Sequence, residues 1–257
     1  MTRPLAKAVA VVTGGGTGIG RAVTLALARA GARAVVVTYR RSAAEAEATA
    51  AQVRSLGCEA MVEAADVADD AQVRRMAERV VENFGELDVL VNNAGTTRAV
   101  DHADLDGLTD EIWHEVLDTN LLGAFHCARA FAPALRASRG AIVNVASISG
   151  YRAGGSSIAY GVSKAALLQL TRNLAVALAP EVRVNAVAPG TVAATRWQPG
   201  LHGEEGFARR AAAEREVVPL RRTAEPEHVA QAVVGLLGMD LVTGEALILD
   251  GGKHVLY

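Results

Sequence analysis

The sequence predicts an α/β fold, a doubly wound parallel sheet of about seven strands with helices on both faces. Short apolar runs rich in Val and Ala recur along the chain of 257 residues, and amphipathic or Ala-rich stretches separate them. Near-continuous apolar runs are typical of strands that are buried on both faces of a parallel sheet. Because crossover connections between parallel strands are right-handed, the helices then cover both faces.

The predicted strands are apolar runs bounded by turn residues. They are Ala8–Val12, Ala34–Thr38, Ala60–Ala64, Leu87–Val91, Ala141–Val145, Val182–Val187 and Ala246–Leu249. Helices are predicted between them, near residues 18–30, 43–56, 69–84, 110–137, 157–179 and 226–238. No linker-like or low-complexity segment interrupts this alternation, so we expect a single domain over residues 1–257.

One stretch, 191–225, breaks the alternation between the sixth and seventh predicted strands. It contains several glycines and the aromatic residues Trp197 and Phe207, with charged residues on both sides. Excursions of this length inside a compact domain are usually functional or mobile. We therefore expect a substrate lid near 191–225, and the alternative is a plain linker.

The composition argues against several classes of protein. The formal net charge of −2 indicates no basic surface for nucleic acid or an anionic membrane, and no apolar run is long enough to span a bilayer. Cys58 and Cys127, the only cysteines, form no CxxC motif, and His114-Glu115 is followed at 118 by Asp rather than by a second His. We expect a cytoplasmic protein with no metal and with neither a nucleic-acid nor a membrane partner.

A glycine-rich turn, Thr13–Gly20, follows the first predicted strand and leads into the first helix, with glycines at positions that include 14, 18 and 20. A pyrophosphate can approach a backbone that lacks Cβ atoms and rest on the unpaired N–H groups of the helix N-terminus. The alternative is a tight corner that needs glycine only for close packing.

Tyr160 and Lys164 lie four residues apart at the start of a long predicted helix, so their side chains point the same way. A free tyrosine has a pKa near ~10, which is poorly suited to proton transfer at neutral pH. A cation about 4 Å away contributes roughly 1–4 kcal/mol, so we expect Lys164 to lower the pKa of Tyr160. Tyr160 then acts as general acid or base at a carbonyl or alcohol oxygen. The alternative is a surface Tyr–Lys pair on an ordinary helix.

Ser147 and Asn120 extend this candidate site. Ser147 follows the fifth predicted strand at the carboxyl edge, where open parallel sheets bind ligands, and its hydroxyl can donate to the same oxygen. Asn120 lies inside the helical stretch 110–137, although asparagine is a poor helix former. It marks a functional position or a local kink whose side chain caps a backbone carbonyl.

Taken in order, these motifs resemble the short single-domain branch of the short-chain dehydrogenase/reductase family, over about residues 8–253. The resemblance implies a Rossmann fold in which Asn120, Ser147, Tyr160 and Lys164 are the catalytic residues. In that reading, Asn120 holds a water that relays protons to Lys164. The family's subunit interfaces imply a homotetramer or a homodimer.

The resemblance also implies a dinucleotide site in which Asp66-Val67 meets the adenine ring, Asn93-Ala94-Gly95 lies beneath the cofactor and Pro189-Gly190 leads to the nicotinamide carboxamide. The implied cofactor-binding residues are Gly14, Thr17, Gly18, Ile19, Gly20, Tyr39, Arg40, Arg41, Asp66, Val67, Asn93, Ala94, Gly95, Tyr160, Lys164, Pro189, Gly190, Thr191 and Val192.

The end of the second predicted strand favours NADP(H) over NAD(H). Members that select NAD carry an acid there for the ribose 2′-hydroxyl, whereas this chain reads Tyr39-Arg40-Arg41-Ser42 and has no acid before Glu45. A guanidinium can bind a 2′-phosphate bidentately. The alternative is a pair of solvated charges at a helix start, where cations are unfavourable.

The predicted activity is the interconversion of a ketone or aldehyde and its alcohol by hydride transfer. The four-residue Tyr–Lys spacing resembles members that act on C=O and CH–OH groups, since the family's enoyl reductases place the lysine further away. We expect reduction of a small carbonyl compound.

Two other functions stay open. Thr96-Thr97-Arg98 and Pro219-Leu220-Arg221-Arg222 resemble the 3-ketoacyl-carrier-protein reductases of fatty-acid or polyketide synthesis. Those enzymes dock their carrier protein through arginines, whereas Ala132 and Val176 occupy the corresponding positions here. A non-catalytic regulator that binds a dinucleotide is the other alternative.

Overall fold

A computed structural model describes residues 5–193 and 197–256 of the chain. Within these residues, seven strands form one parallel sheet in the order β3-β2-β1-β4-β5-β6-β7. The strands are β1 (Val9–Val12), β2 (Ala34–Tyr39), β3 (Glu59–Ala64), β4 (Val89–Asn92), β5 (Ala141–Val145), β6 (Arg183–Pro189) and β7 (Ala246–Leu249). The predicted doubly wound sheet is confirmed, with the reversal of strand order between β1 and β4 that Rossmann folds have.

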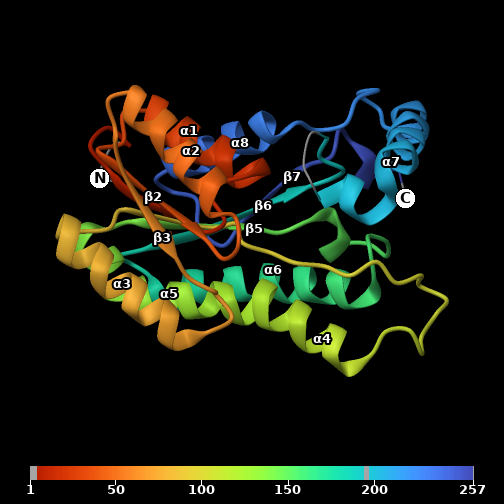
Figure 1. Ribbon diagram of the computed structural model, residues 1–257, viewed down its shortest axis with the longest axis horizontal. Helices are drawn as coiled ribbons and strands as arrows, with labels where there is room; N and C mark the ends of the chain where they lie inside the picture. Colours follow the sequence, from red (N-terminus) through yellow and green to blue (C-terminus); the bar gives the residue numbers. More distant parts are fainter. Residues whose placement is uncertain (1–4, 194–196, 257) are drawn as a thin grey trace.

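Helices cover both faces of the sheet (Figure 1). One face carries α1 (Gly18–Arg29), α2 (Ala43–Ser55) and α8 (Pro226–Gly238). The other carries α3 (Asp70–Phe84), α5 (Gly123–Ser138) and α6 (Ile158–Leu178), with α4 (Asp110–Leu117) leading into α5.

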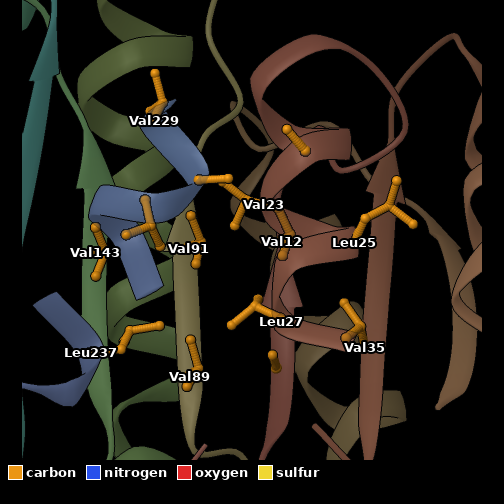
Figure 2. Packing of buried hydrophobic residues seen from close by; sticks show 14 of the residues in the cluster. Val12, Val23, Leu25, Leu27, Val35, Val89, Val91, Val143, Val229 and Leu237 are labelled. Atoms are coloured by element: carbon orange, nitrogen blue, oxygen red, sulfur yellow. The ribbon is translucent and has the colours of Figure 1, made fainter. Parts of the chain in front are cut away.

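Each strand contributes alternate side chains to two hydrophobic cores. In β1, Ala10 and Val12 pack toward α1 and α8, whereas Val9 and Val11 pack toward α3 and α5. Figure 2 shows the side chain of Val12 next to that of Val23 from α1, with Leu237 from α8 further along the same cluster. Because both faces are buried, β1 is apolar at every position, and this is why the sequence predicts it as a continuous run.

The long helical stretch predicted over 110–137 is three elements. Helix α4 ends at Leu117, a π-helical turn spans Asp118–Leu122, and α5 begins at Gly123. Single π-helical turns inside helices occur frequently at functional sites, and this one contains Asn120.

The segment predicted as a lid contains helix α7 (Trp197–Val217), which the sequence analysis does not predict. Gly203 interrupts it with φ 67° and ψ 163°, a conformation that essentially only glycine adopts. A backbone bridge joins Val192 to Ala224, so the two ends of the excursion lie side by side. Residues 194–196 and the side chains of Trp197 and Phe207 lie outside what the structure describes. In the described part of the chain, no helix has the length and apolar character needed to span a membrane.

Candidate active site

A cleft of about 690 Å³ opens at the carboxyl ends of the central strands, next to the reversal of strand order between β1 and β4. Ligands of open parallel sheets bind at such positions. Most residues predicted for the cofactor line it, together with Ser147. They are Gly14, Thr17, Gly18, Ile19, Tyr39, Arg40, Arg41, Asp66, Val67, Asn93, Ala94, Gly95, Tyr160, Lys164, Pro189, Gly190 and Val192.

Three predicted residues do not line the cleft in the described chain. Gly20 lies behind the turn, where a Cβ atom would collide with the Gly14 carbonyl oxygen, so it permits close packing instead. Thr191 directs its hydroxyl at Glu214 of α7, at 2.5 Å. Asn120 is buried beside the cleft, and its side chain forms a hydrogen bond with Thr96 in the cleft wall.

Sequence reasoning missed eight residues that line the cleft. They are Thr38, Ser42, Glu45, Ala65, Thr96, Thr119, Val145 and Ala146. Six of these lie directly beside a predicted residue in the chain, so extending each motif by one position finds them, and Val145 lies two positions before Ser147. Glu45 lies furthest from any predicted residue, and the first turn of α2 brings it back toward Arg40 and Arg41.

The glycine turn presents the start of α1 to the cleft. Gly18 opens the helix with φ 50°, and its N-cap Thr17 makes no side-chain cap within the described chain. The first turn of the helix contains no acidic residue. The unpaired N–H groups and the positive end of the helix dipole therefore suit a phosphate, so the residues present fit a dinucleotide.

Thr13 and Asn93 fix this turn to the neighbouring strand end. The Thr13 hydroxyl accepts hydrogen bonds from the backbone N–H groups of Asn93 and Ala94, both at 2.9 Å. The Asn93 amide donates to the Thr13 carbonyl oxygen at 2.8 Å. These hydrogen bonds hold the turn after β1 and the turn after β4 together in the wall of the cleft.

Tyr160 lies in the first turn of α6, which Ser157 caps by accepting a hydrogen bond from the Tyr160 backbone N–H at 3.3 Å. A hydrogen bond links the phenol to the hydroxyl of Ser147. Burial raises the pKa of Tyr160 above its ordinary value of 10.0, and the Ser147 hydrogen bond offsets this in part. The pKa of Tyr160 is therefore raised, whereas the sequence predicts that Lys164 lowers it.

The position of Lys164 explains why the pKa of Tyr160 is not lowered. Its ammonium donates to the Val145 carbonyl oxygen at 2.8 Å and lies 5.8 Å from the centre of the Tyr160 ring. The residue is only 4% exposed, and burial lowers the pKa of its ammonium from 10.5 to about 8. The charge is therefore held by a backbone carbonyl rather than by the phenol.

Asn120 connects the π-helical turn to both walls of the cleft. Its Oδ1 accepts from the Thr96 backbone N–H at 2.7 Å, and its Nδ2 donates to the Thr96 carbonyl oxygen and to the Ser163 hydroxyl, both at 3.0 Å. Ser163 in turn donates to the Tyr160 carbonyl oxygen at 2.7 Å. Asn120 thus caps a backbone carbonyl, as its alternative interpretation expects, but the carbonyl belongs to Thr96, which is distant in sequence.

A sequence model described as enoyl-(acyl carrier protein) reductase matches residues 14–254, from the glycine turn to the C-terminal turn. The chain belongs to the short-chain dehydrogenase/reductase family. Members of this family are oxidoreductases that use a nicotinamide dinucleotide, and the fold and the cleft agree with that chemistry.

Similar members of the family include ketoacyl reductases. A protein of Streptomyces violaceoruber, named as ketoacyl reductase 2 of the granaticin polyketide synthase, is 46% identical over 96% of each chain. The 3-oxoacyl-[acyl-carrier-protein] reductase of Synechocystis sp. is 36% identical over 96% of this chain and 97% of that protein. A solved short-chain dehydrogenase/reductase structure from Burkholderia xenovorans matches with a TM-score of 0.89 and 33% identity, over 97% of this chain and 98% of that one.

The two arginines at the end of β2 differ in their surroundings. Arg40 forms an ion pair with Asp66 at 3.3 Å. Arg41 is exposed, and within residues 5–193 and 197–256 its guanidinium makes no ion pair or side-chain hydrogen bond. In this short-chain dehydrogenase/reductase, Arg41 is therefore better suited than Arg40 to bind an anion in the cleft, because the charge of Arg40 is paired with Asp66.

Proposed function

We propose that the protein reduces a ketone or aldehyde to the alcohol with NADP(H), and that Tyr160 donates the proton. The observation that carries this proposal is the hydrogen-bonded pair of Ser147 and Tyr160 hydroxyls at the cleft, with the buried Lys164 beside it. The raised pKa of Tyr160 supports the direction of reduction, because the phenol keeps its proton at neutral pH.

Each of the four residues has a distinct part in this mechanism. Ser147 donates a hydrogen bond to the substrate carbonyl oxygen, and Tyr160 transfers its proton to that oxygen as the alcohol forms. A nicotinamide dinucleotide bound in the cleft would supply the hydride for the carbonyl carbon. Lys164 provides positive charge close to the phenol, and Asn120 holds the Thr96 wall against α6.

We favour NADP(H) over NAD(H) because Arg40 and Arg41 line the cleft, and no acid precedes Glu45 after the second strand. A charge-assisted hydrogen bond from Arg41 to a 2′-phosphate would discriminate between the two cofactors. Glu45 and Asp66 also line this part of the cleft, so the cationic character rests mainly on Arg41.

The substrate we propose is a small carbonyl compound, held beneath the segment 191–225 as a lid. A second candidate is the keto group of a carrier-bound chain in polyketide synthesis, which the 46% identity to a polyketide synthase ketoacyl reductase favours. The ratio of kcat/KM for free ketones to that for the same ketones on an acyl carrier protein separates the two.

We propose a homotetramer or homodimer. Leu122 and Phe125 on the outer side of the α5 region and Val162 on α6 are exposed, and they would gain burial between subunits. Light scattering on the purified protein gives the oligomeric state directly.

The test of the function is the oxidation of NADPH with a panel of ketones, aldehydes and enoyl thioesters. A Tyr160→Phe variant should lose on the order of 10²–10⁴ of kcat, the usual contribution of a positioned acid. Tyr151→Phe, an exposed tyrosine, is the matched control. Equal rates for wild type and Tyr160→Phe would exclude the tyrosine mechanism, turnover of enoyl thioesters alone would reassign the reaction, and NADPH binding without any turnover would indicate a non-catalytic regulator.

A further inference from the structure

Helix α7 carries an acidic residue on its buried side. Ala211 and Glu214 in its second half, and Val218 directly after its end, are the residues of the described chain from 211 to 218 turned away from solvent, at the spacing of one helix face. The side chain of Glu214 is only 12% exposed. A carboxylate in such a position needs charged or hydrogen-bonding partners, because burial without them is unfavourable.

Glu214 has two such partners from distant parts of the chain. Its Oε2 accepts a hydrogen bond from the Thr191 hydroxyl at 2.5 Å, and its Oε1 pairs with the Lys253 ammonium at 2.7 Å. Lys253 belongs to the C-terminal turn, and Thr191 to the turn after β6. The carboxylate thus joins three segments, which Figure 1 shows near one another at the C-terminus.

The contact matters for the cleft because Thr191 lies between two residues that line it, Gly190 and Val192. The Thr191 carbonyl oxygen also accepts a hydrogen bond from the Ala224 backbone N–H at 3.0 Å, so its backbone and its side chain are both held. A change at Glu214 therefore alters the position of a turn that faces the cleft, although Glu214 itself does not line it.

We propose that Glu214 is a positioning residue for the nicotinamide cofactor. It holds the turn Gly190–Val192 in its binding conformation and makes α7 and the C-terminal turn part of the cofactor site. This inference depends on the proposed function only in that the cleft binds a nicotinamide dinucleotide. Charge-assisted hydrogen bonds are among the strongest in proteins, so loss of both contacts should weaken cofactor binding roughly tenfold.

The test measures the dissociation constants of NADPH and NADH by calorimetry, which needs no substrate. Glu214→Ala should weaken binding of the preferred cofactor about tenfold, and Glu214→Gln should recover part of the loss because its side-chain oxygen still accepts from Thr191. Thr191→Val combined with Glu214→Ala should cost no more than Glu214→Ala alone, since the two residues share one contact. Glu205→Ala, on the same helix with its side chain 93% exposed, is the matched control and should bind as wild type does.

A Glu214→Ala variant with wild-type cofactor affinity overturns the inference, and so does an equal loss in Glu205→Ala. If Glu214→Ala does not fold, Lys253→Met removes the other side of the ion pair and should raise the KM for cofactor while leaving kcat within about twofold of wild type. If Lys253→Met instead lowers kcat at saturating cofactor and leaves the KM for cofactor unchanged, the positioning role of Glu214 is also overturned. Cofactor binding without turnover refutes the proposed function alone, whereas a wild type that binds neither dinucleotide refutes both.

Discussion

The Lys164 ammonium lies 5.8 Å from the centre of the Tyr160 ring and donates its hydrogen bond to the Val145 carbonyl oxygen. Both side chains leave the same side of α6, as their four-residue spacing predicts. Within the described residues, the hydrogen bond of the ammonium nevertheless goes to this carbonyl oxygen and not to the phenol. Burial of each group, rather than their mutual attraction, therefore sets the direction of each pKa.

A Lys164→Met variant should show the cost of burying this ammonium. The pKa of Lys164 falls from 10.5 to about 8 in the folded protein, so the folded state releases this proton first as the pH rises. Between these values the unfolded chain binds more protons, and the stability of wild type should rise with pH relative to that of the variant. The full difference is about 3 kcal/mol, since one pKa unit corresponds to about 1.36 kcal/mol.

Urea unfolding of both proteins at several pH values from about 7 to about 10 measures this difference. Comparison with the variant cancels the contributions of other groups that titrate in the same range. A difference that stays constant over the range would mean that Lys164 keeps its ordinary pKa in the folded protein.

The strands were predictable because their burial on both faces leaves a local mark in the sequence. Ala141–Val145 and Ala246–Leu249 match the prediction residue for residue, and the other strands differ at their ends by one or two residues. Helix α7 leaves no such mark, because its buried side carries a glutamate and Gly203 interrupts it. A helix whose packing depends on distant charged partners shows no apolar periodicity.

A Ser157→Ala variant should weaken the start of α6. The Ser157 hydroxyl is fully buried and caps the helix through the backbone N–H of Tyr160. Its loss should lower the free energy of unfolding by about 1 kcal/mol, the usual value for an N-cap. We also expect a lower kcat, because the cap orients the turn that carries the phenol. Ser157→Thr keeps an acceptor and should retain most of both quantities, and equal losses in the two variants would contradict the capping role.

The residues of the candidate site were predictable where neighbours in the chain form a motif. The turns after β1 and β4 lie at one edge of the sheet because parallel strands all end there. Side-chain contacts between segments that are distant in the chain could not be predicted from the sequence in this way. The pairing of Arg40 with Asp66 and of Thr191 with Glu214 depends on packing between distant segments, and spacing along the chain does not record it.

An Asn120→Ala variant should destabilise the protein by about 1–3 kcal/mol, the cost of leaving a buried polar group unpaired. Asn120 is 1% exposed, and its removal leaves the Thr96 backbone groups and the Ser163 hydroxyl without this partner. Thermal and urea unfolding measure the loss. Gln169→Ala, which removes two exposed amide hydrogen bonds from the surface of α6, is the control. A loss no larger than that of the control would mean that the π-helical turn holds the cleft wall without Asn120.

An Arg41→Ala variant should reduce the preference for NADPH over NADH. A charge-assisted hydrogen bond contributes about 1.5–3 kcal/mol, so the ratio of kcat/KM values should fall at least about tenfold. The rate with NADH should change little, because NADH has no 2′-phosphate. Arg40→Ala should change the ratio less, since the Arg40 charge is already offset by Asp66 at 3.3 Å. Initial rates with both cofactors measure these ratios in the three proteins. An unchanged ratio in Arg41→Ala together with a large fall in Arg40→Ala would assign the 2′-phosphate to the paired arginine, and would mean that Asp66 releases it when the cofactor binds.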